Sequence, residues 1–166
     1  VFRSSDDRDA WELTSGSQER RRLTQAKEPI EQVQLSPDSR WIAYNTAESG
    51  RSEAYVSPVP ATGRRWQISN EGGVQPLWRA DGREIYYLGL DAAVYAVEVR
   101  VEGQEFKTGR PQLLFRTLLP VISAVVEQYR VSPDGGRFLL CAPLTSPQRE
   151  PLRMLLNWSA KLARAR

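Results

Sequence analysis

One turn motif recurs three times along the chain, and this recurrence constrains the fold more than any other feature of the sequence. Its copies read SPDSRWIAYN, RADGREIYYL and SPDGGRFLLC, with turn aspartates at Asp38, Asp81 and Asp134. An aspartate side chain can accept hydrogen bonds from backbone amides within a turn, and adjacent Pro or Gly residues suit the dihedral angles of a turn. The sequence therefore predicts three tight turns, each joining two antiparallel strands, with these aspartates as structural turn residues.

The spacing of the turns indicates a repeating four-stranded unit. The aspartates are separated by 43 and 53 residues, and the longer interval contains the additional segment TLLPVISAVVEQ. A period of roughly 40 to 45 residues with four strands per unit is typical of a β-propeller blade. The strands expected in the first full unit are 30–35, 40–46, 52–59 and 64–70, and those in the next unit are 74–80, 84–90, 93–100 and 105–115.

Hydrophobic patterning predicts different surroundings for the strands of one unit. The second strand is apolar on both faces at Trp41–Tyr44, as expected of a strand that lies between two neighbouring sheets. In the fourth strand, Trp66 and Ile68 alternate with polar residues, which is typical of an outer strand with one solvated face.

Both ends of the chain are expected to lie within a blade. The segments VFRSS, AWELTS and RRLTQ suit the second, third and fourth strands of a first blade, and the last unit offers strands only at 127–133, 137–143 and 152–159. The predicted fold is therefore an all-β partial β-propeller of four-stranded antiparallel blades, with fourteen strands in about three and a half blades. The expected blade boundaries are 1–27, 28–72, 73–117 and 118–162, followed by a basic tail at 163–166.

These motifs resemble those of a known family. The stretches SPDSRWIAYNTAESGRSEAYVSPVP, GGVQPLWRADGREIYYL, TGRPQLLF, YRVSPDGGRFLL and LNWSAKL resemble WD40-like (PD40), TolB-type β-propeller repeats. They are similar in particular to the propeller at the C-terminus of bacterial serine/threonine kinases and related membrane-anchored sensors. The resemblance spans Leu35 to Leu162, and Ser39 departs from it where the family favours Gly.

The resemblance implies a non-catalytic scaffold for ligand sensing or protein–protein interaction. Any catalysis would belong to another part of a larger parent protein, and the propeller would lie in the periplasm or elsewhere outside the cytoplasm. Family propellers close with roughly six blades, so this chain is expected to form a C-terminal part of a ring. The beginning of the chain has neither an initiator Met nor a signal-peptide pattern, which agrees with that expectation.

Residue content limits the chemistry that the chain can perform. The sequence contains no histidine, so neither a Ser-His-Asp triad nor a histidine-ligated metal site can be built from it. It also lacks phosphate-binding Gly-rich motifs and kinase motifs, and we expect no cofactor. The single cysteine, Cys141, follows three apolar residues, and we expect it to be buried and unreactive.

Charge and hydropathy argue against two classes of partner. The chain has 23 basic and 20 acidic residues, and Lys161, Arg164 and Arg166 account for the excess of positive charge. A nucleic-acid partner is therefore not expected. The longest apolar stretch, LLPVISAVV, has nine residues, whereas a membrane-spanning helix needs about 18 or more.

Two further clusters have simpler structural explanations. The segment SSDDRD places three carboxylates close together but lacks the spacing of a calcium loop, so an exposed turn is favoured. The tryptophans Trp41, Trp66, Trp78 and Trp158 could stack on sugars or bases, but their positions in predicted strands favour core packing.

The predicted binding surface lies where loops gather at one end of the propeller. These loops join the second strand of a blade to the third, and the outer strand of one blade to the inner strand of the next. Loops on a rigid scaffold commonly carry recognition. The interaction candidates are Glu48, Ser49, Arg51, Glu71, Gly72, Gln75 and Asp91.

Two other functional classes stay open from the sequence. The chain could be the propeller part of a prolyl-oligopeptidase-type serine peptidase, although LNWSAKLARAR is typical of a chain end rather than of a linker to a hydrolase domain. It could also belong to a periplasmic TolB-like envelope protein. In each case an isolated partial ring would expose sheet faces, and we expect it to self-associate or to aggregate.

Overall fold

The computed structural model describes residues 2–3, 9–14, 16, 19–24, 26–103 and 105–142. Every regular element within these ranges is a β-strand, and all pairings between strands are antiparallel. This part of the chain contains no helix of the length and hydropathy needed to cross a membrane.

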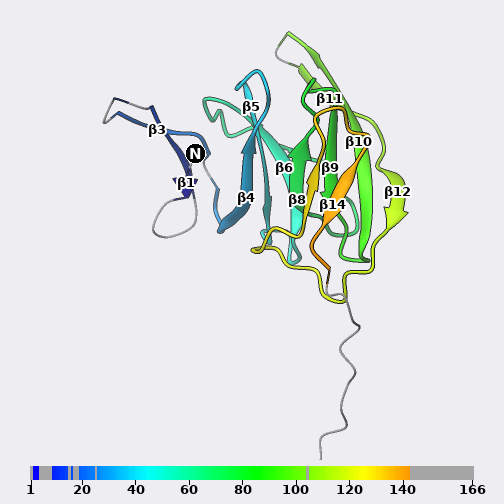
Figure 1. The fold of residues 1–166 in the computed structure, drawn as a ribbon. Helices are drawn as coiled ribbons and strands as arrows, with labels where there is room; N and C mark the ends of the chain where they lie inside the picture. Colours follow the sequence, from blue (N-terminus) through cyan, green and yellow to red (C-terminus); the bar gives the residue numbers. More distant parts are fainter. Residues whose placement is uncertain are drawn as a thin grey trace, which may run out of the picture.

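The strands form four successive sheets, in which neighbours along the chain are mostly neighbours in the sheet (Figure 1). The first sheet consists of β1 (Phe2–Arg3), β2 (Ala10–Leu13) and β3 (Arg20–Arg22). The second consists of β4 (Ile30–Leu35), β5 (Trp41–Thr46), β6 (Glu53–Pro58) and β7 (Trp66–Gln67). The third contains β8 (Val74–Trp78), β9 (Glu84–Leu88), β10 (Ala93–Glu102), β11 (Glu105–Thr108) and β12 (Gln112–Arg116), and the fourth contains β13 (Tyr129–Val131) and β14 (Phe138–Leu140).

A separate hydrophobic core lies between each sheet and the next. Strand β5 contributes to two of these cores, because successive side chains of a strand point to opposite faces of the sheet. Trp41 and Ala43 pack toward the third sheet, whereas Ile42 and Tyr44 pack toward the first. The predicted burial of this strand on both faces is therefore confirmed.

The first strands of neighbouring sheets lie side by side near one axis. The backbone amide of Trp78 on β8 donates to the Gln34 Oε1 on β4 at 2.7 Å. Sheets that follow one another, pack face to face and bring their first strands together have the arrangement of propeller blades. The chain thus folds as an all-β partial β-propeller.

Each turn aspartate caps its turn in the same way. The Oδ1 atoms of Asp38, Asp81 and Asp134 accept a hydrogen bond from the backbone amide two residues later, at 3.1, 3.0 and 3.1 Å. The Arg79 guanidinium also donates to both carboxylate oxygens of Asp81, at 2.8 and 2.7 Å. That side-chain hydrogen bonding, with the turn amide, lowers the pKa of Asp81 to about 2.

The third sheet differs from the single outer strand expected at 105–115. This segment forms two strands, β11 and β12, and both pair with β10. Strand β10 has ten residues, so its edge is long enough to pair with β12 along its first half and with β11 along its second half. The break falls at Gly109, whose backbone amide donates to Glu98 O at 2.8 Å.

The prediction for Cys141 is wrong, because this residue is exposed. Side chains alternate along β14, so that Phe138 and Leu140 pack on the third core while Leu139 is 70% exposed. Within the described part of the chain, β14 pairs only with β13, and no further sheet covers its outer face. Cys141 follows on the exposed side of this alternation.

Some expected elements are shorter or fall outside the described residues. The strand predicted at 64–70 covers only β7, and the strand predicted at 152–159, the tail and most of SSDDRD are not described. The described part of the structure contains fourteen strands, the number that the sequence predicts, but two differences cancel. One expected strand is replaced by two, β11 and β12, and the expected strand 152–159 lies outside the described residues.

Candidate functional site

Three connections gather at one end of the sheets, as the sequence predicts for its interaction candidates. They are 47–52, 68–73 and 89–92, and we call the surface that they form with the connection 117–128 the loop face. The Gly73 amide donates to Ser52 O at 3.0 Å, which joins the first two connections. The second connection packs closely against the third at Gly72. A Cβ atom at this residue would lie only 2.5 Å from Leu90 Cδ1.

A buried carboxylate fixes the first two connections. Glu53 on β6 is 1% exposed, and its Oε1 accepts hydrogen bonds from Arg51 Nε at 2.6 Å and from the Gly72 amide at 3.0 Å. Its Oε2 accepts a hydrogen bond from Ser69 Oγ, and Ser69 is buried although the strand pattern placed it on the solvated face. Buried charges are retained when they are paired and hydrogen-bonded, so Glu53 is a structural centre of the loop face.

The candidates of the first connection already have partners within the molecule. Arg51 pairs with Glu53 and also donates to Asn70 O. Glu48 forms an ion pair with Arg65, whose guanidinium lies 4.8 Å from the centre of the Tyr55 ring. A cavity of about 440 Å³ lies beside Ser49, Arg51 and Glu53.

The remaining loop candidates line a second cavity, which has a volume of about 380 Å³. Glu71, Gly72 and Asp91 contribute to it together with Arg110 and two stacked phenol rings. Those rings belong to Tyr87 and Tyr95, whose centroids lie 5.2 Å apart with an interplanar angle of 14°. We call this space the tyrosine cavity.

Charge in the tyrosine cavity is distributed unevenly. Asp91 Oδ2 accepts hydrogen bonds from Tyr95 Oη at 3.0 Å and from Arg116 Nη1 at 3.1 Å. Within the described part of the chain, Glu71 and Arg110 make no side-chain hydrogen bond or ion pair. A carboxylate and a guanidinium are thus available there to polar groups of a ligand.

Gln75 lies elsewhere, on an inner strand. It is 2% exposed, at a register shift in β8, with a positive φ of 56°. Its Nε2 donates to Ser123 O at 2.7 Å and to Val126 O at 2.8 Å. Its Oε1 accepts a hydrogen bond from the backbone N–H of Gln128 at 2.7 Å. Because its side chain is buried and bonded, we assign it to the support of the loop face rather than to its surface.

Two other glutamines repeat this role. Gln32, Gln75 and Gln128 each stand six residues before a turn aspartate. Gln32 lies at a register shift in β4 with a φ of 51°, and its Nε2 donates to Val125 O. Gln128 Nε2 donates to Val121 O at 2.8 Å. The regular spacing is visible in the sequence, but our sequence reasoning did not use it.

Gln32 and Gln75 fasten a connection across the inner strands, and Gln128 braces that connection from within. Figure 1 shows residues 117–128, in yellow, running from β12 along the lower edge of the view toward β4 before they return to β13. Four of the large apolar residues of this connection are exposed: Leu118 at 91%, Val121 at 71%, Val126 at 63% and Val125 at 56%. We call these four residues the apolar loop patch.

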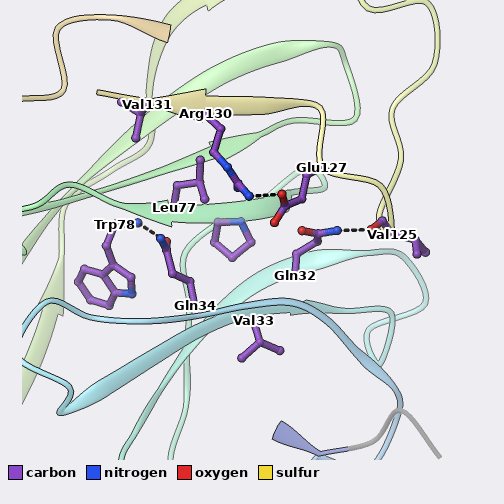
Figure 2. Close-up of a pocket in the computed structure, with 10 residues that line it drawn as sticks. Gln32, Val33, Gln34, Leu77, Trp78, Val125, Glu127, Arg130 and Val131 are labelled. Atoms are coloured by element: carbon purple, nitrogen blue, oxygen red, sulfur yellow. Dashed lines mark hydrogen bonds and ion pairs between the residues drawn. The ribbon is translucent and has the colours of Figure 1, made fainter. Parts of the chain in front are cut away.

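A cavity of about 520 Å³ lies next to this patch, among the inner strands of three sheets. Figure 2 shows Gln32 and Gln34 from β4, Leu77 and Trp78 from β8, and Arg130 from β13 around it. Arg130 forms an ion pair with Glu127 at the same wall. Val125 belongs to both the patch and the cavity, so the two form one continuous surface.

The tryptophans belong mainly to the packing of the sheets. Trp41 and Trp78 are buried in the core between the second and third sheets, and Trp66 packs against it. Trp158 lies outside the described residues. The described residues contain no group of three or more His, Cys, Asp or Glu side chains placed to hold a metal ion.

Comparisons with known proteins give matches among solved structures alone. No family model matches the chain, and no curated protein sequence matches it. A structure of putative TolB from Agrobacterium tumefaciens is similar with a TM-score of 0.47 and 20% identity, covering 60% of this chain and 40% of that one. TolB from Acinetobacter baumannii is similar with a TM-score of 0.46 and 16% identity, covering 83% of this chain and 44% of that one. The chain thus spans less than half the length of either structure.

Proposed function

We propose that this chain is a non-catalytic β-propeller module that binds a protein partner through its loop face. The observation that carries the proposal is the apolar loop patch. Four apolar side chains are exposed on a connection that Gln32 and Gln75 fasten to the inner strands and that Gln128 braces from within. Exposed apolar patches on a rigid support are typical of protein-interaction sites.

The surroundings of the patch suit a polypeptide. The cavity of about 520 Å³ beside it is lined by Gln32 and Gln34 together with Leu77 and Trp78. A peptide presents the same mixture of backbone amides and apolar side chains. Glu71 and Arg110 in the tyrosine cavity add charged groups, and polar contacts of this kind give specificity more than affinity.

Selection from a random peptide library displayed on phage tests the proposal. Peptides selected on the unmodified chain are expected to bind at least about tenfold more weakly to the double variant Leu118→Asp, Val121→Asp, because charge replaces apolar contact. The matched control is Leu13→Asp, which changes an exposed leucine of the first sheet and should leave affinity unchanged. Selected peptides that bind both variants as well as the unmodified chain would contradict the proposal.

We further propose that the module lies outside the cytoplasm as part of a larger kinase-linked or other sensor protein. The support is the resemblance of its turn and strand motifs to such propellers. The neighbouring coding sequence tests this directly. A kinase domain and a membrane span upstream would support it. A GxSxG-bearing domain downstream would instead indicate a peptidase, and a signal peptide with a small upstream domain would indicate a TolB-like envelope protein.

We also propose that the isolated chain self-associates through its open end. Leu139 on β14, the last described strand, is an exposed large apolar side chain at this end of the described chain. Light scattering should show a mass that rises with protein concentration. A folded monomer at every concentration would overturn the proposal.

A further inference from the structure

A fourth cavity lies at the end of the second sheet opposite to the loop face, and its lining has an unusual charge distribution. Its volume is about 370 Å³. Its lining includes Arg40, Arg64, Trp41, Trp66, Pro58 and Pro60, with one threonine. Apart from one threonine hydroxyl and the two arginines, these side chains are apolar. We call this space the arginine–tryptophan cavity.

Its walls come from parts of the chain that the fold holds together firmly. Trp41 begins β5 and is buried, and its ring lies 5.6 Å from that of Trp66 on β7 in an edge-on arrangement. The Val59 amide donates to Arg40 O at 2.8 Å, which ties the proline segment to the turn before β5. The indole N–H of Trp41 has no hydrogen-bond partner.

The two arginines differ in how far they are neutralised. Arg40 Nε lies 3.1 Å from Asp38 Oδ2, so a carboxylate offsets its charge. The Arg64 guanidinium lies over the Trp66 ring at 5.2 Å from the ring centre, and within the described residues it makes no ion pair. No acidic side chain lines the cavity. Its uncompensated charge is therefore positive.

We propose that this cavity binds a small amphiphilic carboxylate, with the apolar body against Trp66 and the prolines and the carboxylate at Arg64. A cavity of this size accommodates a ring or a short aliphatic chain, and small-molecule sites combine an apolar lining with a few polar groups. A guanidinium is well suited to a carboxylate because its N–H donors match the two oxygens. The cation–π contact with Trp66 restricts the guanidinium before a ligand binds, which lowers the entropy lost on binding.

The test uses 4-phenylbutyrate as the probe and the full 166-residue chain. Titration followed by calorimetry and by NMR shifts of the tryptophan indole N–H groups should show binding, with the largest shifts at Trp66 and Trp41. Arg64→Gln should weaken binding at least about tenfold, because it removes the charge while it keeps a polar side chain. The uncharged analogue 4-phenylbutan-1-ol should bind the unmodified chain more weakly by a similar factor.

The matched control is Arg100→Gln. Arg100 is an exposed arginine of β10 that pairs with Glu98 and does not line this cavity. The variant Arg100→Gln should bind the probe with an affinity within about twofold of that of the unmodified chain. Equal affinity of Arg64→Gln and the unmodified chain would overturn the proposal, as would equal affinity for acid and alcohol or shifts confined to other tryptophans. Because the cavity lies away from the loop face, these outcomes are independent of the peptide selection.

Discussion

The second strands of the second and fourth sheets follow the same turn motif but have different surroundings. Ala43 and Leu139 stand at equivalent positions, five residues after their turn aspartates, yet the first is fully buried and the second is 70% exposed. Strand β5 lies between two sheets, whereas β14 is covered on one face only by the described chain. The comparison teaches that the repeat determines the strand, while the neighbouring sheets determine its burial.

The same substitution in the two environments should give the largest contrast. Leu88 on β9 is fully buried, so Leu88→Ala should lower the free energy of unfolding by about 2 to 5 kcal/mol, through lost burial and a residual cavity. Leu139→Ala should change it by less than about 0.5 kcal/mol, because the side chain is already in solvent. Urea unfolding followed by tryptophan fluorescence measures both. Similar losses would show that β14 is covered as completely as β9.

A buried charge should behave differently from an exposed one. Glu53→Ala is expected to destabilise the fold by about 3 kcal/mol, because it leaves the Gly72 amide and Arg51 without their acceptor. Glu102→Ala removes an exposed partner of Lys107 and should cost less than about 1 kcal/mol. Urea unfolding of the two variants provides the comparison, and an unchanged midpoint for Glu53→Ala would contradict the role given to this carboxylate.

The glutamine support of the loop face should have an intermediate effect. Gln75→Ala removes hydrogen bonds to the connection 117–128 and should cost about 1 to 2 kcal/mol. Gln112→Ala, on the exposed surface of β12, should cost less than about 0.5 kcal/mol. In Gln75→Ala, hydrogen exchange should also become faster at the backbone N–H of Gln128, which loses its acceptor. Unchanged exchange at this amide would mean that Gln75 does not fasten the connection.

The smallest effect is a pH dependence at the second turn. The pKa of Asp81 falls from 3.8 to about 2 on folding, through Arg79 and the turn amide. A depressed folded pKa stabilises the fold above the unfolded value, and this stabilisation is lost as the pH falls from about 4 to 2. Solvent screening limits it to about 1 kcal/mol, because the carboxylate is exposed. Asp81→Asn should reduce the change in unfolding free energy across this window, and an unaltered pH profile would contradict the assignment.

Local patterns were sufficient to predict most of the strands. The turn aspartates mark the boundaries of β4–β5, β8–β9 and β13–β14, and the apolar runs after them supply the second strands. The division of 105–115 into β11 and β12 could not be predicted, because it depends on the length of the β10 edge. The burial of β14 could not be predicted either, because it depends on what lies next to the sheet.

The candidate site could be predicted only in part. Topology indicated which connections gather, and the structure places Glu71, Gly72 and Asp91 around one cavity. Tyr87 and Tyr95 belong to strands on which sequence alone does not distinguish core from cavity. The apolar loop patch lies in the additional segment of the longer repeat interval, whose path depends on contacts with Gln32 and Gln75, distant in sequence.

Thiol labelling at Cys141 tests the central claim that the described chain is an arc of packed sheets whose last sheet has an open outer face. In the native chain Cys141 should react with a small thiol reagent at a rate close to that of the unfolded chain, because it is exposed. The equivalent position of the third sheet provides the control. Leu88 stands seven residues after Asp81, as Cys141 does after Asp134, and it is fully buried. In a Cys141→Ser background, the cysteine of the variant Leu88→Cys should therefore react at least about a hundredfold more slowly. Equal protection of the two thiols would contradict the account, because the last sheet would then be covered on both faces.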